Sequence, residues 1–312
     1  MKRIQYHHYG GPEEMRLEPF KLPSPAKDEI LVRVHASSVN PADWKIRQGA
    51  MKIMSGWKLP RAMGTDFSGV VESIGSEVKR FRYGDEVMGT VALKPSGAFA
   101  EMLLTKEHLA VKKPMAITHE QASTLPMAGV TAWKALVQKA QLKTGQRVFI
   151  NGANGGVGQA ATHIARALGA TVTLRVSPSA LARATALGIT SVLDYTKEIP
   201  SDLRASFDVV FDCNGSLSVN QGNMLVNRRG VVLDINPNQA KFMRSLISPR
   251  RKLVFGTQDT HTLKNVVDLA AKGKLSITIG RRESLSNAIG LIRDLEAGQR
   301  CAGKAVIVLD LA

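Results

Sequence analysis

The sequence predicts an α/β protein of two domains, in which a compact β-barrel domain precedes a doubly wound domain built on a parallel sheet. Three observations lead to this prediction. The chain has 312 residues, roughly twice the length of a common domain. Its first third contains short apolar-polar alternating runs between closely spaced glycines and prolines. From about Thr118 onwards, apolar runs typical of strands alternate with stretches of helical periodicity.

The strands predicted for the first domain are short and half-buried. Residues 29–36 alternate apolar and polar side chains, which is the period of a strand with one face in the core. Residues 69–75 and 85–89 are similar runs bounded by glycine. Turn sequences such as Asn40-Pro41 and Gly84-Asp85 separate these runs at the spacing of a small barrel.

The second domain is predicted from strands that alternate with helices, because such an order produces right-handed β-α-β units and a parallel sheet. A helix is expected within residues 121–140, with a break before 131–139 caused by Pro126 and Gly129. The remaining expected elements, in chain order, are strand 146–150, helix 157–168, strand 170–176, helix 179–187, strand 191–194, strand 207–212, helix 217–226, strand 230–235 and strand 253–257.

The last part of the chain is expected to hold helices at 263–272 and 285–295 and an apolar strand at 304–309. This last strand is predicted to return to the first domain, which makes that domain discontinuous. The predicted domains are therefore residues 1–117 with 263–312, and residues 118–262.

Composition restricts the function classes. The net charge is +16, but the cations occur in short separate groups and aromatic residues are only 5% of the chain, which disfavours a nucleic-acid interface. Contact with an anionic membrane surface stays open as an alternative to a solvated basic surface. Two cysteines cannot form a disulfide framework, and the charged N-terminus lacks the apolar core of a secretory signal. These features predict a cytoplasmic protein.

The strongest site signal is the glycine-rich segment 151–158, which follows a predicted strand and opens a predicted helix. Ala153, Gly155 and Gly158 occupy the three small positions of the dinucleotide-binding fingerprint. Small residues there allow a tight turn, a close approach of the backbone to a pyrophosphate and close packing of the helix on the strand. The candidate cofactor-binding residues of this segment are Ala153, Asn154, Gly155, Gly156, Val157 and Gly158.

The end of the second predicted strand favours NADP(H) over NAD(H). Enzymes that prefer NAD carry an acidic residue about 20 positions after the glycines, and none is present here. Arg175 and Ser177 stand in that region instead, and Tyr195 follows the next strand, so these three are candidates to bind a 2′-phosphate. The alternatives are a surface role for Arg175 and a packing role for Tyr195.

Four segments together resemble one protein family: residues 37–49, 64–71 and 125–133, and the glycine-rich segment. Their spacing is similar to that of the zinc-independent quinone oxidoreductases of the medium-chain dehydrogenase/reductase superfamily, and Lys45 is similar to the lysine of the alkenal and oxoene reductases. The resemblance implies a GroES-like β domain, a Rossmann domain, a homodimer and an active site in the interdomain cleft.

The resemblance also implies that both zinc sites of the related alcohol dehydrogenases are missing. Asn40 stands at the position of the first zinc-binding cysteine, and Thr65 stands at that of the histidine. No cysteine precedes Cys213, so a four-cysteine zinc lobe is excluded. We therefore expect no metal.

Reduction of a conjugated acceptor is the chemistry expected without a metal, because hydride addition to a quinone or an α,β-unsaturated carbonyl needs only positioned donors for the oxygen that gains charge. Lys45 and Asn40 are the candidate catalytic donors. By resemblance, Thr131 is expected near the nicotinamide. The alternatives are a solvated lysine, a backbone cap at Asn40 and an ordinary helix residue at Thr131.

Other functions stay open from the sequence. The family also contains enoyl-thioester reductases. Some members bind NADPH and act as regulatory or RNA-binding proteins with weak turnover. A peripheral membrane enzyme acting on lipid quinones is a further alternative. The leading prediction is an NADPH-dependent reductase of a small quinone or enone.

Overall fold

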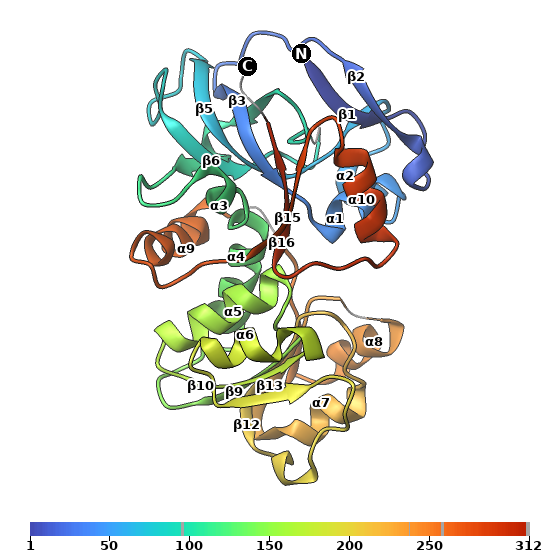
Figure 1. The fold of residues 1–312 in the computed structure, drawn as a ribbon, viewed down its shortest axis with the longest axis vertical. Helices are drawn as coiled ribbons and strands as arrows, with labels where there is room; N and C mark the ends of the chain where they lie inside the picture. Colours follow the sequence, from blue (N-terminus) through green and yellow to red (C-terminus); the bar gives the residue numbers. More distant parts are fainter. Residues whose placement is uncertain (95–96, 237, 257–258, 310–312) are drawn as a thin grey trace. The chain divides into compact units, whose positions relative to one another are not determined.

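The computed structural model describes residues 1–94, 97–236, 238–256 and 259–309, and the chain divides into two compact units (Figure 1). The β unit comprises Met1–Met127, Gln258–Ala271 and Ile279–Ala312. The α/β unit comprises Ala128–Thr257 and Lys272–Thr278. The chain passes from the first unit to the second within helix α4 (Pro126–Trp133), whereas the sequence placed that boundary before residue 118.

The β unit is organised around a seven-stranded sheet whose central strand, β3 (Glu29–Ser38), pairs with β5, β7 and β16. Ile30, Val32 and Val34 point into one core because alternate side chains of a strand share a face. A second sheet has the order β2-β1-β4. The strands are β1 (Lys2–Tyr6), β2 (Met15–Pro19), β4 (Arg61–Ala62), β5 (Asp66–Ile74), β6 (Glu86–Thr90), β7 (Met102–Lys106), β8 (Ala110–Lys112), β15 (Ile279–Ser284) and β16 (Lys304–Val308).

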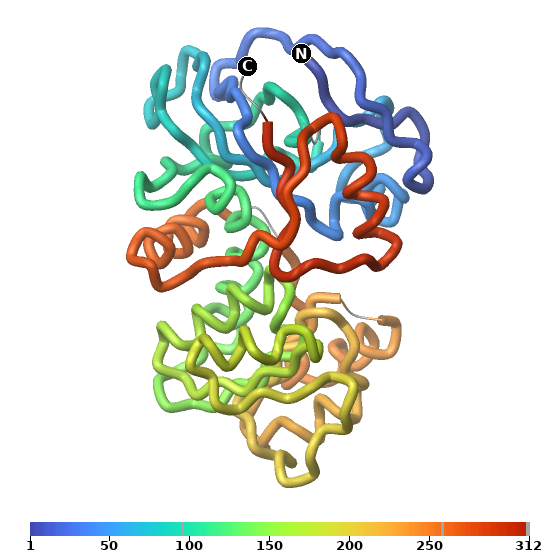
Figure 2. Tube along the Cα trace, viewed as in Figure 1, coloured from blue at the N-terminus to red at the C-terminus, as the bar shows by residue number. Residues whose placement is uncertain are grey.

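The predicted return of the last strand to the first unit is confirmed. Strand β16 pairs antiparallel with β3, and the Val39 N–H donates to the Ala305 carbonyl at 3.0 Å. The tube in Figure 2 shows this red segment running beside the blue one. Strand β15, which the sequence analysis missed, is an edge strand with half-exposed polar side chains, so it lacks an apolar alternation.

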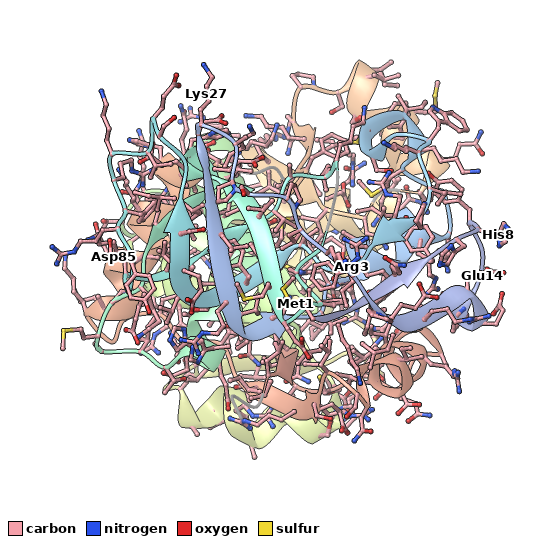
Figure 3. The ribbon with its side chains drawn as sticks, turned by 90° about the horizontal axis from the view of Figure 1, so that it is seen from above. Met1, Arg3, His8, Glu14, Lys27 and Asp85 are labelled. Atoms are coloured by element: carbon pink, nitrogen blue, oxygen red, sulfur yellow. The ribbon has the colours of Figure 1, made fainter. Side chains whose placement is uncertain are left out.

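The helices of the β unit are mostly short: α1 (Pro41–Arg47), α2 (Lys52–Ser55), α3 (His119–Ser123), α9 (Thr260–Ala271) and α10 (Ala288–Glu296). Arg47 of α1 is fully buried, and its Nη2 donates to both carboxylate oxygens of Glu296 on α10, at 2.7 and 2.5 Å. In Figure 3, His8 lies beside Glu14 at the edge of the unit, and the His8 Nδ1 is 3.5 Å from the Glu14 Oε2.

The α/β unit has the predicted doubly wound parallel sheet, in the order β11-β10-β9-β12-β13-β14. Phe149, Phe207 and Val210 lie in its core. Its strands are β9 (Arg147–Asn151), β10 (Thr171–Val176), β11 (Ser191–Asp194), β12 (Phe207–Asp212), β13 (Val226–Asp234) and β14 (Arg251–Leu253), and its helices are α5 (Gly156–Ala167), α6 (Leu181–Ala186), α7 (Val219–Leu225) and α8 (Gln239–Ile247).

Three local predictions for this unit were wrong in whole or in part. The predicted break is present before Pro126, since α3 ends at Ser123, but α4 is not interrupted at Gly129. A proline in the first turn lacks only an N–H that has no intrahelical acceptor. Helix α4 continues as a π-helical segment, Lys134–Lys139. The sixth strand ends at Leu253 rather than beginning there, and Thr257, its predicted end, lies outside the described residues. Helix α8 was not predicted at all.

Candidate functional site

The glycine-rich segment forms a tight loop between the central strand β9 and helix α5. Gly155 is the residue before the helix, with extended backbone, and α5 begins at Gly156. The N–H groups of the first helical turn have no intrahelical acceptor, and the positive end of the helix dipole lies with them. The loop therefore presents donors suited to a phosphate at the carboxyl end of the sheet.

The glycines of the loop differ in why a side chain is absent: backbone conformation, close packing or open space. Gly152 has a φ of +78°, so the tight turn falls on this residue rather than on Ala153 as the sequence predicted. A Cβ on Gly158 would lie 2.4 Å from the Gly152 carbonyl oxygen and 2.6 Å from the Ala153 Cα, so the close packing of helix on strand needs glycine. A Cβ on Gly155 would meet only the Gly152 carbonyl oxygen, at 3.7 Å. The fold itself therefore leaves space for a side chain at Gly155.

The predicted 2′-phosphate residues stand at the ends of neighbouring strands. Arg175 lies in β10, Ser177 follows it, and Tyr195 follows β11 with an exposed ring. The Arg175 Nη2 donates to the Tyr195 carbonyl at 2.8 Å and to the Lys197 carbonyl at 3.3 Å. The structure therefore brings these residues together, but the Arg175 guanidinium is turned inward and is largely buried.

Sequence analysis missed Arg183, whose side chain contacts the phosphate loop. The Arg183 Nη1 donates to the Asn154 Oδ1 at 2.8 Å. Arg183 lies in α6 and is exposed. The only sequence signal for this contact is a cation placed seven residues after the end of β10, in a region without carboxylates.

A buried polar network supports the carboxyl ends of the central strands. The Asn151 Nδ2 at the end of β9 donates to the Asp212 Oδ1 at 2.8 Å. The Lys241 Nζ of α8 lies 2.5 Å from the Asp212 Oδ2 and 3.1 Å from the Asp234 Oδ1, and Arg251 binds Asp234. All these side chains are buried. The two aspartates are thus neutralised within the fold, and they hold α8 to the sheet.

A second buried network lies in the β unit and includes Asn40; we call it the Asp66 network. The Asn40 Nδ2 donates to the Thr65 Oγ1 at 3.2 Å and to the Asp66 Oδ2 at 3.0 Å, and its Oδ1 accepts from the Lys304 Nζ at 2.5 Å. The Asp43 Oδ2 accepts from the Asn40 N–H at 2.7 Å. Both N–H bonds of the Asn40 amide are therefore used inside the protein.

Burial shifts the ionisation of the charged members of this network. It raises the pKa of Asp43 to about 7 and also raises the pKa of Asp66, although the nearby Lys304 and the hydrogen bonds oppose the shift. It lowers the pKa of Lys304. The Lys304 Nζ is 3.9 Å from the Asp66 Oδ2. Asp43 therefore caps the start of α1, and it is buried and coupled to other charges.

The other two predicted residues lie on separate helices. Lys45 is half-buried in the last turn of α1, the helix that Asn40 caps. Thr131 lies in α4, in its α/β-unit portion, and is buried.

The Asp66 network does not fit a zinc ion. The groups that could ligate a metal there are hydroxyl, amide and carboxylate groups. The Lys304 ammonium already binds Asn40 and faces Asp66, so it would repel a cation at this place. Within the described ranges, no group of three or more histidine, cysteine, aspartate or glutamate side chains is arranged to hold a metal ion. Cys213 and Cys301 are free thiols, and burial raises the pKa of each.

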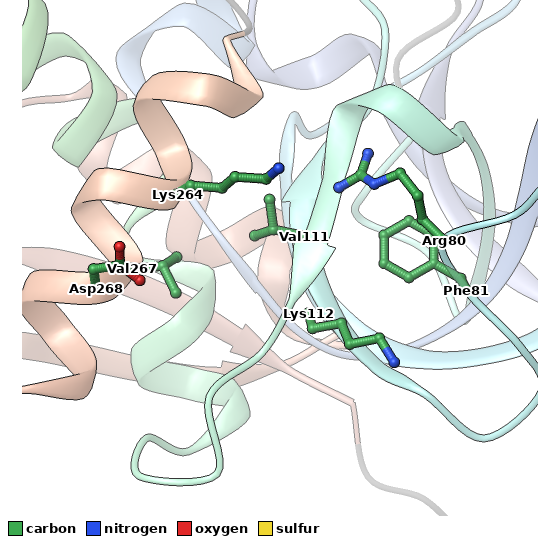
Figure 4. A pocket seen from close by; sticks show the side chains of 7 residues that line it. All are labelled: Arg80, Phe81, Val111, Lys112, Lys264, Val267 and Asp268. Carbon is green, nitrogen blue, oxygen red and sulfur yellow. The ribbon is translucent and has the colours of Figure 1, made fainter.

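A pocket of about 270 Å³ in the β unit lies apart from the predicted site residues (Figure 4). Figure 4 shows β8 and the loop between β5 and β6, which carries Arg80 and Phe81, on one side and α9 on the other. Arg80 donates there to the Glu107 and Ala110 carbonyls, and Lys112 pairs with Asp85 at 3.0 Å, so these cations already have acceptors. The lining residues are Arg80, Phe81, Val111, Lys112, Lys264, Val267 and Asp268.

Known proteins resemble the chain along nearly its whole length. The alcohol dehydrogenase GroES-like domain family matches residues 26–115, and the zinc-binding dehydrogenase family matches residues 156–272. The chloroplast envelope quinone oxidoreductase homolog of Arabidopsis thaliana is 30% identical over 304 residues, which cover 92% of this chain and 92% of that protein. The NADPH-dependent alkenal/one oxidoreductase of the same plant, a chloroplastic protein, is 35% identical over 248 residues, covering 74% of this chain and 63% of the relative.

Among solved structures, the quinone oxidoreductase from Coxiella burnetii superimposes with a TM-score of 0.86 at 29% identity, covering 99% of each chain. Across the described residues, no helix is both long enough and apolar enough to cross a membrane.

The two family matches, the doubly wound sheet with its glycine loop and the full-length relatives agree with the resemblance found in the sequence. The chain therefore belongs to the zinc-independent quinone oxidoreductase branch of the medium-chain dehydrogenase/reductase superfamily.

Proposed function

We propose that the protein transfers hydride from NADPH to a quinone or to an α,β-unsaturated carbonyl compound. The observation that carries this proposal is the phosphate loop, in which Gly155 leaves open a space that the fold itself does not require. The names of two relatives, a quinone oxidoreductase homolog and an NADPH-dependent alkenal/one oxidoreductase, support the acceptor class.

The chemistry divides between the cofactor and the chain. Bound NADPH would supply the hydride from its nicotinamide ring. The chain must then bind and orient both partners and stabilise the negative charge that develops on the acceptor oxygen. The polar groups of the Asp66 network do not suit a Lewis-acidic metal, so side chains that donate hydrogen bonds must stabilise the charge on the acceptor oxygen.

Lys45 is our candidate donor to the acceptor oxygen, and Asn40 is a positioning residue. Because its two amide N–H bonds go to Thr65 and Asp66, Asn40 has no N–H left for a substrate. It instead holds the start of the helix that carries Lys45. We keep Thr131 as a residue for the nicotinamide amide; its side chain is buried at α4.

Selectivity for NADPH over NADH is part of the proposal. From residue 151 to residue 193 the chain contains no aspartate or glutamate, so the usual carboxylate partner of a ribose 2′-hydroxyl is lacking there. Of the three residues predicted for this end of the sheet, Ser177 and Tyr195 remain our proposals for the 2′-phosphate, whereas the Arg175 guanidinium is largely buried and bonded to backbone carbonyls.

We also propose a homodimer that acts on a small molecule, in a reducing compartment such as the cytoplasm. The outward face of α8 is apolar, and the adjacent strand β14 is the last of its sheet. An apolar face next to an open strand edge is suited to a two-fold contact between identical chains. Nucleic acid is not favoured, because the basic groups lack interleaved aromatic residues.

The experiment that tests the reaction is NADPH oxidation against quinones, enals, enones and enoyl thioesters. We expect turnover with the first three classes. Lys45→Ala should lower kcat by about 100- to 1000-fold, the typical effect of losing one donor to a developing oxyanion, and should leave the Kd of NADPH unchanged. Lys79→Ala, which alters an exposed lysine of the β unit, is the matched control.

Turnover restricted to enoyl thioesters would replace our substrate class with the enoyl-thioester alternative. Lack of turnover together with tight NADPH binding would favour a binding protein. An unchanged kcat in Lys45→Ala would remove Lys45 from the mechanism.

A further inference from the structure

The phosphate loop has a cation bound to it from outside the loop. Arg183 reaches back from the first turns of α6, and its Nη1 donates to the Asn154 Oδ1 at 2.8 Å. Asn154 lies between Ala153 and Gly155, on the part of the loop nearest the open space at Gly155. The guanidinium therefore lies beside the surface where the adenosine end of a dinucleotide approaches a doubly wound sheet.

Arg175, the cation that the sequence singled out, has acceptors inside the protein. Its Nη2 donates to two backbone carbonyls, and its Nη1 is 3.5 Å from the Asn151 Oδ1. Burial lowers its pKa, whereas the nearby Asp212 and Asp194 carboxylates act in the opposite direction. Because its guanidinium is largely buried and bonded to backbone carbonyls after β11, Arg175 is suited to hold β10 and that loop together.

Arg183 differs from Arg175 in its exposed side chain and in its single recorded acceptor. Among the residues that the structure describes, it makes no ion pair, and its recorded acceptor is the neutral amide oxygen of Asn154. Its side chain is exposed, and the segment that carries it, residues 151–193, contains no aspartate or glutamate. A guanidinium has five N–H donors in a planar fork, so the one used for Asn154 leaves others for an anion.

Two hydroxyl groups lie on the same segment. Ser177 follows β10, and its Oγ is 3.0 Å from the Ser179 Oγ. In doubly wound folds, the residues just after the second strand meet the ribose 2′ position. Ser177, Ser179 and Arg183 thus offer two neutral donors and one cation at the place where a 2′-phosphate, with nearly two negative charges, distinguishes the cofactors.

We infer that Arg183, oriented by Asn154, binds the 2′-phosphate of NADPH and sets the cofactor preference, while Arg175 has a structural role. This inference rests on the proposed function, because it presupposes that the loop binds NADPH. Asn154 connects pyrophosphate binding with 2′-phosphate binding, because it lies in the pyrophosphate loop and holds the guanidinium that contacts the 2′-phosphate.

The test is a titration of the purified full chain with NADPH and with NADH, followed by intrinsic fluorescence. Arg183→Ala should raise the Kd of NADPH about 10- to 100-fold, the usual effect of losing a charge-assisted contact, and should change the Kd of NADH less than about twofold. Arg183→Lys should keep part of the preference because the charge remains. Arg166→Ala, which removes an exposed arginine of α5, is the matched control and should change neither constant.

The outcomes separate the two proposals. If the wild type binds both cofactors equally, the proposed NADPH selectivity fails whatever Arg183 does. If the wild type prefers NADPH and Arg183→Ala keeps that preference, only the inference about Arg183 is overturned. An equal loss of affinity for both cofactors in Arg183→Ala would also overturn it, since that result assigns Arg183 a purely structural role in the loop.

Discussion

At the scale of single residues, the β unit contains two histidine rings that the fold keeps neutral. His119 of α3 stacks on His35 of β3, with ring centroids 4.3 Å apart. The His119 Nδ1 is 2.8 Å from the Ser68 Oγ of β5, and its Nε2 is 3.2 Å from the Glu86 Oε1 of β6. Burial and the neighbouring His35 lower the pKa of His119 to about 4, against the opposing effect of Glu86.

This shift predicts a loss of stability on mild acidification. The pKa in the unfolded chain is about 6.5, above that of the folded state, so acid favours the unfolded chain. The contribution of His119 is fully present above about pH 6.5 and is lost as the pH falls toward 4. We expect a loss of roughly 1–2 kcal/mol, reduced from the full shift because the ring is partly solvated.

Urea unfolding of the wild type and of His119→Gln between pH 7.5 and 4.5 measures this effect. The glutamine amide can still bond to Ser68 and Glu86 but does not titrate, so the variant should lose less stability. Asp43 titrates in both proteins and cancels in the comparison. His8→Gln, at an exposed position, is the control. Equal pH slopes in wild type and His119→Gln would show that His119 does not carry the effect.

At the scale of elements, the glycines of the phosphate loop differ in role, because one is required for folding and another is available for ligand binding. Gly158 is required by the close packing of α5 on the loop, because an added Cβ would meet backbone atoms that cannot move aside. Gly155 meets no such obstacle. The same fingerprint therefore contains one glycine for the fold and one for the ligand.

We predict that Gly158→Ala and Gly155→Ala differ in kind. Gly158→Ala should lower the free energy of unfolding by about 1–3 kcal/mol, the usual cost of overpacking. Gly155→Ala should unfold like the wild type and bind NADPH about tenfold or more weakly, since its methyl group would keep a phosphate from the backbone donors. Thermal unfolding and cofactor titration of both variants check this, and a destabilised Gly155→Ala would contradict it.

Helix α8 buries a charged side chain and exposes apolar ones. Lys241 is fully buried against Asp212 and Asp234, whereas Phe242, Met243, Leu246 and Ile247 are 47%, 56%, 66% and 71% exposed. A helix usually buries its apolar stripe, so α8 is inverted with respect to the common pattern. The α/β unit itself therefore leaves this apolar face exposed.

At the scale of the whole molecule, we expect a second copy of the chain to cover this face. Sedimentation equilibrium should show a dimer for the wild type. Leu246→Glu should weaken self-association by about 2 kcal/mol or more, because it places a charge in an apolar contact. Ile53→Glu, on the exposed surface of α2, should leave the dimer intact.

Two results would contradict the dimer interface. One is a dimer that persists in Leu246→Glu. The other is a monomeric wild type that co-sediments with anionic vesicles while Leu246→Glu does not, which would assign the face to a membrane surface.

Local signals predicted those parts of the molecule in which a segment specifies its own structure. The period of two in β3, the glycine spacing before α5 and the apolar run of β16 each depend on nearby residues, and each was located from the sequence. The edge strand β15 and helix α8 were missed. The side chains of β15 are polar because it lies at the edge of its sheet, and α8 turns its apolar face outward because Lys241 is buried against aspartates of neighbouring strands.

By itself, then, the sequence determined the fold class, the family and the phosphate loop, since turn geometry and side-chain periodicity are local properties. Only the tertiary structure decided how buried charges are paired. It joined Asn40 to Lys304 and Asp212 to Lys241, turned Arg175 inward and brought Arg183 to Asn154. The physical reason is that the low polarity of a protein interior makes each buried charge depend on partners distant in the chain, and sequence spacing does not specify which partner it meets.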